Sequence, residues 1–322
     1  MSTTSRILAS LTPFALLAAC DSGSHALPSA LGNGITAMMF STEGTPWSAP
    51  VNLAAVNATS TDAHPDLSKD ELSLYFTSDR PGGVGGNDIW VSQRACSECD
   101  WQAPVNVSAL NTTGVDAAPA LSIDGHLMFF HSNRAGGHGG NDIYVSRRAD
   151  PKDDFGWGPP QLLGPDVSTA ADENAPVYLQ SAEDGPANLY FTRGVAGTQG
   201  QDLYVAAVTR DGETLGPAVL ASDLYSIVND AAPTVRTDGR EILFHSPRAG
   251  TLGVADLWVS TRPNVSEPWS TPVNVGAPLS TPSFDQQPSL SYNGRTLVWA
   301  SDRPGGSGGL DIWMATRTPS GH

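Results

Sequence analysis

The sequence predicts an all-β protein that forms a single β-propeller, a ring of four-stranded blades. Two observations support this fold class. A unit of about 55 residues recurs five times along the chain. Glycine and proline are also abundant, with 33 and 25 of 322 residues, which is typical of many short strands joined by tight turns.

The recurring unit contains three strand signals separated by turn signals. A Pro precedes the first strand, an apolar and aromatic run forms the second, and an Asp after a Gly-rich loop begins the third. A Trp-x-x-Pro-Val-Asn motif between units predicts a fourth strand, so each unit is expected to form one blade. The units span residues 62–94, 116–148, 173–208, 230–262 and 285–317. The fourth-strand motif occurs at Trp47, Trp101 and Trp269, more weakly at Trp157, and in degraded form at Leu215.

The order of these signals predicts how the ring closes. The chain begins with a fourth strand at 47–53 and ends with a third strand at 311–316. If 47–53 completes the last blade, five blades close without an unpaired edge. An apolar stretch at 35–41, ITAMMFS, leaves six blades as the alternative.

The N-terminus has the three-part pattern of a secretory signal. Arg6 is followed by an apolar run, small residues and Cys20. The sequence Leu-Ala-Ala-Cys resembles the bacterial lipoprotein box, so residues 1–19 are predicted to be a signal peptide and Cys20 to be lipidated. Residues 20–34 are expected to form a flexible tether and residues 35–322 the propeller. These features predict a lipid-anchored protein of the bacterial cell envelope, on the periplasmic or outer-membrane face.

Replacing the lipidated residue tests the predicted anchor. No later segment is long and apolar enough to span a bilayer, so membrane attachment is expected to depend on the lipid alone. Cys20→Ser is therefore expected to move the protein from the membrane to the soluble fraction. Unchanged membrane fractionation of this variant would contradict the lipid anchor.

Composition and motif patterns exclude several functions. The formal net charge of −16 disfavours nucleic-acid binding, which depends on Lys and Arg. The Gly-x-Ser-x-Gly pattern of serine hydrolases occurs only as GGSGG at 305–309, inside a repeat loop where other units carry Val84 or His138 in place of the Ser, so serine hydrolysis is not predicted. The loops GGVGGND (82–88) and GGHGGND (136–142) resemble calcium-binding β-helix repeats but place the acidic residue one position late. Neither a metal nor a cofactor is predicted.

Acidic residues recur directly before the innermost strand of each predicted blade. In a ring these five carboxylates are expected to surround the channel mouth and to bind a ligand, although capping of a local turn is an equally ordinary role for Asp. His64 joins the ligand-binding candidates because the other units carry Ala or Gln at its position. The candidates are Asp62, His64, Asp116, Glu173, Asp230 and Asp285.

Two further histidines follow second strands, at His131 and His245. Together with His64 they raise the question of a three-imidazole metal site. The three residues belong to units 1, 2 and 4, which are not all adjacent in a ring. No metal site is therefore predicted from them.

Two other local pairings are expected. Cys96 and Cys99 lack the additional ligands of a zinc site, and in an oxidising compartment they are predicted to form a disulfide. Each Gly-rich loop also lies between an Arg and an Asp, which predicts an Arg–Asp pair across its base. These loop arginines are Arg80, Arg134, Arg248 and Arg303, opposite Asp88, Asp142, Asp256 and Asp311.

The motif D-x-x-P-x-L-S-x-D-G, followed by L-x-F-x-S-D-R and D-I-W/Y, resembles the WD40-like propeller repeat of the TolB type, also called PD40. Units 62–94, 116–148 and 285–317 carry the closest resemblance. The resemblance implies a non-catalytic scaffold that binds an envelope protein or a glycan, with no nucleic acid and with the membrane contacted only through the lipid. The alternative is a carbohydrate-active enzyme that uses acidic residues at the central channel, with Glu173 as the candidate that departs from the repeat.

Overall fold

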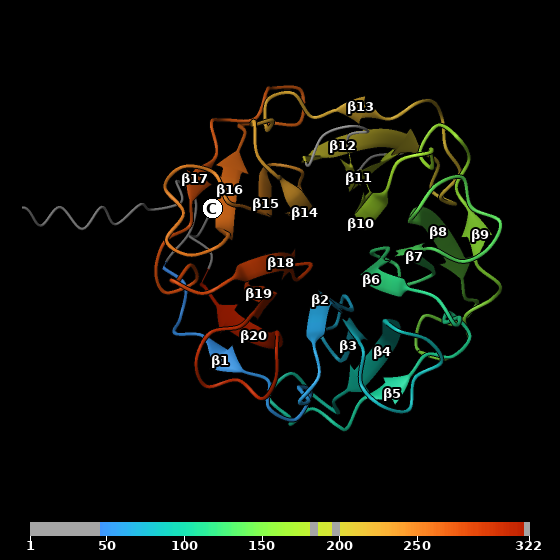
Figure 1. The fold of residues 1–322 in the computed structure, drawn as a ribbon, viewed down its shortest axis with the longest axis horizontal. Helices are drawn as coiled ribbons and strands as arrows, with labels where there is room; N and C mark the ends of the chain where they lie inside the picture. The colour runs from blue at the N-terminus through green and yellow to red at the C-terminus, as the bar shows by residue number, and fades with distance from the viewer. Residues whose placement is uncertain (1–45, 181–185, 195–199, 319–322) are drawn as a thin grey trace, which may run out of the picture. The chain divides into compact units, whose positions relative to one another are not determined.

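The computed structural model describes residues 46–180, 186–194 and 200–318. Within these ranges the strands form five four-stranded antiparallel sheets arranged as blades around a central axis (Figure 1). This confirms the predicted all-β propeller with five blades. No helix in the described part of the chain is long and apolar enough to cross a membrane. The predicted signal peptide (1–19), Cys20, the tether (20–34) and the apolar stretch 35–41 lie outside the described residues.

The strands of each blade follow one another outward from the axis. Blade 1 contains β2 (Asp62–Leu67), β3 (Ser73–Ser78), β4 (Asp88–Gln93) and β5 (Val105–Asn106). Blade 2 contains β6 (Asp116–Leu121), β7 (Leu127–Ser132), β8 (Asp142–Arg147) and β9 (Gln161–Leu162). Blade 3 contains β10 (Glu173–Leu179), β11 (Ala187–Gly194), β12 (Gln201–Val208) and β13 (Val219–Leu220). Blade 4 contains β14 (Ala231–Val235), β15 (Glu241–Ser246), β16 (Asp256–Thr261) and β17 (Val273–Asn274). Blade 5 contains β18 (Asp285–Leu290), β19 (Thr296–Ser301), β20 (Asp311–Thr316) and β1 (Val51–Asn52).

The ring closes as the order of strand signals predicted. Strand β1 pairs with β20, with Val51 opposite Met314 and Asn52 opposite Trp313. The first and last strands therefore share one sheet, and β20 has no free edge. The outer strand is shorter than the expected 47–53, because ladder pairing is limited to two residues.

The Trp of the fourth-strand motif packs against an Arg at the end of the third strand. In four blades the guanidinium lies over the indole ring at 4.1–4.5 Å from its centroid, a cation–π geometry. The contact ties the short outer strand to its neighbour. The pairs are Arg94–Trp101, Arg148–Trp157, Arg262–Trp269 and Arg317–Trp47.

Every innermost strand contains a bulge at its D-x-x-P motif. The pairing register with the second strand shifts there, between Ala63 and Asp66 in blade 1 and at the equivalent place in the other four blades. The Pro has no N–H to donate to the ladder, and the residue before it adopts a positive φ of 45–55°. A non-glycine residue in this region is strained and persists only where surrounding contacts hold it. The residues with positive φ are His64, Ala118, Ala175, Ala232 and Gln287.

The contacts that hold these strained residues join neighbouring blades. The backbone N–H of each donates to a side chain of the preceding blade. The acceptor is Thr77 Oγ1 for Ala118, His131 Nδ1 for Ala175, Thr192 Oγ1 for Ala232 and His245 Nδ1 for Gln287, at 2.9–3.4 Å. Blade 5 carries Ala300 at the acceptor position, and the N–H of His64 instead meets Oε1 of Gln287 at 3.1 Å. A hydrogen bond from the residue with positive φ is therefore present at every junction around the ring.

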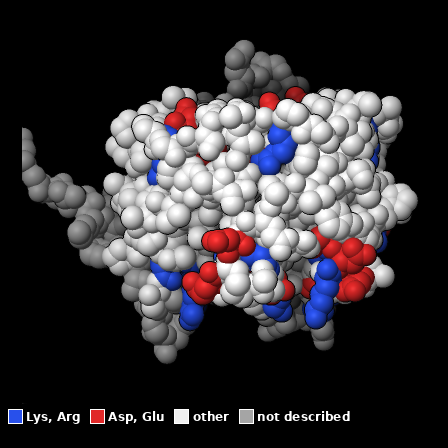
Figure 2. All heavy atoms as spheres, turned by 90° about the horizontal axis from the view of Figure 1, so that it is seen from below, with Lys and Arg blue, Asp and Glu red and all other residues white. Residues whose placement is uncertain are grey.

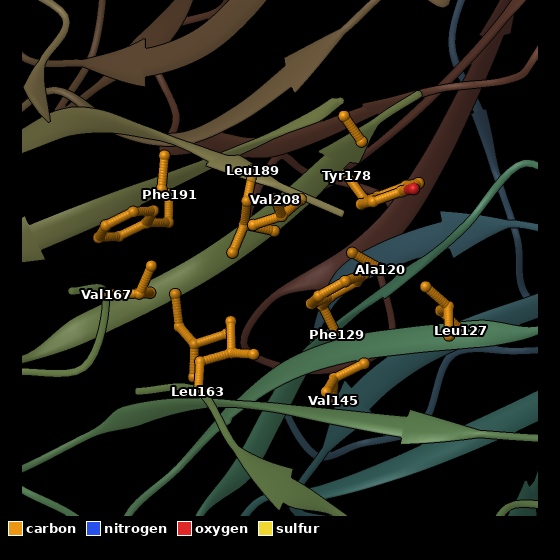
Figure 3. Close-up of a cluster of buried hydrophobic side chains, with 13 residues drawn as sticks. Ala120, Leu127, Phe129, Val145, Leu163, Val167, Tyr178, Leu189, Phe191 and Val208 are labelled. Atoms are coloured by element: carbon orange, nitrogen blue, oxygen red, sulfur yellow. The ribbon is translucent and has the colours of Figure 1, made fainter. Parts of the chain in front are cut away.

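The hydrophobic core is divided among the junctions between blades. Figure 3 shows the cluster between blades 2 and 3, where the rings of Phe129 and Tyr178 stack with centroids 5.1 Å apart. Leu163 of blade 2 and Leu189 of blade 3 belong to the same cluster. Four similar clusters fill the other junctions. Burial of apolar surface between blades is the main favourable term holding the ring together.

Charged side chains are unevenly distributed over the part of the surface seen in Figure 2. In this view they gather mainly toward one face of the ring, and most of the side wall carries neither acidic nor basic residues. The hairpins between first and second strands contribute exposed acids such as Asp70 and Asp124. The net negative charge is thus not spread evenly over this side of the molecule.

Candidate functional site

The five acids before the innermost strands are buried and engaged with arginines. Each carboxylate has no measurable exposure, and each lies 2.5–2.8 Å from a guanidinium nitrogen of its own blade. Such charge-assisted pairs are strong when buried and fully hydrogen-bonded. The pairs are Asp62–Arg80, Asp116–Arg134, Glu173–Arg193, Asp230–Arg248 and Asp285–Arg303.

The same acids also cap the loop that enters each blade. The second oxygen of Asp62 accepts from Ala58 N at 2.6 Å, and Asp285 accepts from Thr281 N at 2.7 Å. The paired arginine donates to a carbonyl of that loop, as Arg303 does to Leu279 O. None of the five acids lines the central recess described below. The geometry therefore matches turn capping, the ordinary role considered for these residues, and not the expected ring of ligand-binding carboxylates.

Glu173, the acid that departs from the repeat, follows the same pattern. It accepts from Thr169 N and Oγ1 and from Arg193 Nε, at 2.6–2.8 Å. Burial raises the pKa of its carboxyl, although the bonds from Thr169 and Arg193 act in the opposite direction. Its contacts give it the same structural role as the four aspartates.

The predicted pairing across the Gly-rich loops is wrong. Arg80 pairs with Asp62 and not with Asp88. Asp88 turns back onto its own loop, where its carboxylate accepts from the amides of Val84 and Gly85 and from Asn106 Nδ2. Consecutive loop amides form a concave site for a carboxylate, so Asp88 is satisfied without the arginine.

Cys96 and Cys99 are joined by a disulfide in the loop between β4 and β5, with Cα atoms 5.0 Å apart. Arg94 Nη1 donates to the carbonyl of Ser97 inside this loop at 2.5 Å. The loop is exposed, and neither cysteine lies near the axis of the ring.

A small recess, with a cavity volume of about 30 Å³, lies on the axis. The recess is lined by the middle of the innermost strands. In blade 1 the lining residues are His64, Pro65 and Asp66, whereas Asp62 and Ala63 at the start of the strand do not line it. Since Asp62 pairs with Ser78 and Leu67 with Leu74, this part of each strand leads to the first hairpin and away from the Gly-rich loop. The five repeated acids, which lie beside the Gly-rich loops, are therefore at the other end of the strands.

The two sides of the recess differ in chemistry. Blades 2, 3 and 4 contribute only Ala, Pro and Val, and three of these alanines contact one another: Ala118, Ala175 and Ala232. Blades 5 and 1 contribute the polar side chains, which are His64, Asp66, Gln287 and Ser289. A ligand in the recess meets an apolar wall on one side and hydrogen-bonding groups on the other.

Asp66 is the only carboxyl among the described residues that line the recess. Its Oδ2 accepts from Leu121 N and its Oδ1 from Ser289 Oγ, both at 2.8 Å. Burial raises the pKa of Asp66 to about 7, against these two hydrogen bonds, which lower it. Near neutral pH this carboxyl is therefore partly protonated, as a general acid must be.

Asp66 was missed by the sequence analysis, although a signal for it exists. The equivalent positions hold Ala120, Val177, Thr234 and Ser289. The comparison between units that singled out His64 identifies this acid two residues later.

His64 lies near two other histidines, His131 and His245. Its ring is 5.9 Å from that of His131, in an edge-to-face arrangement. Burial, followed by the nearby imidazoles of His131 and His245, holds the pKa of His64 well below its ordinary value. Its Nδ1 is buried and has no hydrogen-bond partner among the described residues. His64 is thus a neutral imidazole with an unused nitrogen.

His131 and His245 have a structural explanation. Their Nδ1 atoms accept the inter-blade hydrogen bonds that Thr77 and Thr192 accept elsewhere. Within the described ranges no group of three or more His, Cys, Asp or Glu residues is arranged to hold a metal ion.

Several departures from the repeat meet at the closure junction, the contact between blade 5 and blade 1. Gln287 bonds to His64, and Ser289 bonds to Asp66. Glu71 occupies a turn position at φ 59°, where three other units carry Gly, and it accepts from Asn293 and Thr296 of blade 5. The junction that is closed by non-consecutive parts of the chain therefore also holds the polar side of the recess.

Comparison with known proteins identifies relatives by fold only. No protein-family model and no curated protein matches the sequence. Among solved structures, the chain is similar to an α-L-arabinofuranosidase from Lactobacillus brevis, with 16% identity, a TM-score of 0.55, and coverage of 81% of this chain and 93% of that one. It is similar to the α-L-arabinofuranosidase PaAbf62A from Podospora anserina in complex with cellotriose, with 11% identity, a TM-score of 0.57, and coverage of 85% and 97%. It is also similar to the arabinanase Arb43A from Bacillus subtilis, with 12% identity, a TM-score of 0.52, and coverage of 80% and 94%.

These similarities correct two expectations. The similar structures reported above are glycoside hydrolases and not TolB-type propellers, so the family resemblance is not upheld. The non-catalytic scaffold that it implied loses its basis for the same reason. A short repeat motif specifies the strands and turns of a blade, and that local pattern does not distinguish propellers of different families.

Proposed function

We propose that the protein is a carbohydrate-active enzyme that hydrolyses a glycosidic bond at the central recess. The observation that carries this proposal is Asp66, a recess carboxyl whose pKa of about 7 suits proton donation near neutral pH. The similar folds of arabinofuranosidases and an arabinanase support the reaction class and make arabinose-containing glycans the first substrates to test.

The recess supplies the acid of such a reaction, Asp66, but no accessible base among the described residues. Most glycosidases use two carboxylates for these roles. Here Asp66 donates its proton to the departing glycosidic oxygen as the bond to the anomeric carbon breaks. The water whose oxygen forms the new bond to that carbon releases its proton to solvent, because the buried Nδ1 of His64 is not accessible to it. Asp66 then regains a proton from solvent, which balances the proton that the water released.

This mechanism predicts the stereochemistry of the product. Water attacks in a single step, from the side opposite the leaving group, so the anomeric configuration is inverted. The walls of blades 2 to 4 are apolar, like the C–H face of a sugar ring, and no Lys or Arg lines the recess among the described residues. A neutral sugar residue is therefore the expected occupant.

Replacement of Asp66 by Asn tests the proposal. Asn keeps the size of the side chain but has no acidic proton, so kcat for an unactivated arabinofuranosyl substrate is expected to fall at least about 100-fold. Wild-type activity is expected to decline above pH 7, because the donor is then deprotonated. Reducing-sugar release measures the rate, and proton NMR of the first product identifies the anomer.

Asp70→Asn provides the matched control, since Asp70 is an exposed acid of the same blade in the first hairpin. Its rate is expected to equal that of the wild type. Equal rates for Asp66→Asn and wild type would remove Asp66 as the donor. Absence of wild-type turnover on a panel of neutral glycans would contradict the proposed function itself.

A further inference from the structure

The carboxyl of Asp66 is held by two different neighbouring blades. Blade 2 supplies the backbone N–H of Leu121 to Oδ2, and blade 5 supplies the hydroxyl of Ser289 to Oδ1. Ser289 is itself 6% exposed, so water does not readily replace its hydroxyl. The orientation of Asp66 in the recess therefore depends on the closure junction.

The two partners differ in what they can do when Asp66 gains a proton. A backbone amide only donates, so a proton on Oδ2 would face the amide hydrogen of Leu121. A serine hydroxyl can donate or accept. The acidic proton therefore resides on Oδ1, where Ser289 turns from donor to acceptor. The oxygen that faces Ser289 is the one that carries the transferable proton.

We propose that Ser289 is a positioning residue for Asp66, which places the acidic proton on Oδ1 and sets how tightly the carboxyl holds it. A hydrogen bond to a charged carboxylate is stronger than one to the neutral acid. Ser289 therefore favours the charged form, and its loss makes Asp66 a weaker acid. The effect on proton affinity stands on this geometry, and only its consequence for catalysis rests on the proposed function.

Few other titratable groups face this carboxyl. His64 is on the same strand, and Tyr75 lies opposite Asp66 in the register of β3. The Tyr75 hydroxyl is turned to Asp154, to which it donates at 2.7 Å. The described elements of blades 2 and 5 contribute only Leu121 and Ser289 as hydrogen-bond partners of Asp66.

The repeat itself provides the variants for a test. The positions equivalent to Ser289 hold Ala120 in blade 2, Val177 in blade 3 and Thr234 in blade 4. Ser289→Ala, Ser289→Val and Ser289→Thr therefore place residues that the fold already accommodates at this site. Valine and threonine have nearly the same shape, so this pair separates loss of the hydroxyl from a change of packing.

The measurement is the titration of the Asp66 carboxyl carbon by NMR in the full protein labelled with ¹³C-aspartate, with Asp66→Asn identifying the signal. The pKa of Asp66 is expected to rise by about one unit in the Ala and Val variants, because one charge-assisted hydrogen bond is lost. The Thr variant is expected to restore the wild-type value. Ser122→Ala is the control, since Ser122 donates to an aspartate, Asp124, in the hairpin of blade 2.

The outcomes separate this inference from the proposed function. Titration of Asp66 at the wild-type pH in both the Ala and Val variants would overturn the role of Ser289. An upward shift in a protein without glycan turnover would support the inference while contradicting the enzyme. With turnover, the decline of kcat at alkaline pH is expected to move upward by the same amount as the titration.

Discussion

Asp285→Ala is expected to lower the free energy of unfolding by about 3–5 kcal/mol at pH 7, because it leaves a buried guanidinium without its carboxylate. Asp285 has no exposed surface and Arg303 is 8% exposed, so water replaces little of the lost contact. The variant also removes the acceptor for Thr281 N and Oγ1, which releases the loop entering blade 5. Urea unfolding followed by tryptophan fluorescence measures the change.

Asp302→Ala is the matched control for this prediction. Asp302 caps the same loop, accepting from Phe284 N at 2.7 Å, but it is exposed. Surface substitutions of this kind usually change stability by less than about 1 kcal/mol. A similar small loss for Asp285→Ala would show that the buried pair is not structural and would reopen a ligand-binding role for the five acids.

The double variant His131→Thr and His245→Thr is expected to resist acid better than the wild type. Burial lowers the pKa of each imidazole to about 4, from 6.5 in the unfolded chain. Below pH 6.5 the unfolded state therefore binds more protons, and stability is lost as pH falls toward 4. For His131, which is 5% exposed, the loss is about 2 kcal/mol at pH 5 and on the order of 3 kcal/mol at pH 4. It is smaller for His245, which is less buried.

Threonine is the appropriate replacement because the ring already uses it. Thr77 and Thr192 accept the same inter-blade N–H at 2.9 Å in other junctions, and a hydroxyl does not titrate in this range. Asp66 changes the stability with pH in the opposite direction. Because its pKa is raised to about 7, its ionisation lowers the free energy of unfolding as pH increases from about 4 to 7. That contribution is common to both proteins and cancels in the comparison.

Chemical unfolding at pH 7, 5 and 4 measures the difference between the double variant and wild type. The variant is expected to gain relative stability at each step toward lower pH. His138→Thr is the control, because His138 is exposed in a Gly-rich loop and accepts no inter-blade bond. A constant difference across the three pH values would show that His131 and His245 do not carry the acid sensitivity.

The blade pattern was predictable because strand and turn signals close together in the sequence specify it. Each strand is bounded by turn residues within a few positions, and the unit recurs five times, so strand order and closure by the segment 47–53 follow from counting. The bulge at the D-x-x-P motif was not predicted, although a Pro that cannot donate to the ladder is consistent with it. The strands and turns within a blade are decided mainly by contacts between residues that are close in the chain.

The partners of the charged residues were less predictable. Arg80 lies eight residues before Asp88 and eighteen after Asp62, and the nearer acid was the predicted partner. The structure pairs it with the more distant one, because strand pairing places Asp62 opposite Ser78, beside the arginine. Register across the sheet, and not separation along the chain, decides which carboxylate Arg80 meets.

By itself, the sequence determined an all-β ring of five blades and the strand that closes it, because periodic strand and turn signals act over a few residues. Only the tertiary structure decided that the five repeated acids are buried supports and that Asp66, with His64 and Ser289, forms the polar side of the recess. The physical reason is that burial and hydrogen-bonding of Asp66 come from blades 2 and 5, which lie about 55 and 220 residues away in the chain and reach it only when the ring closes.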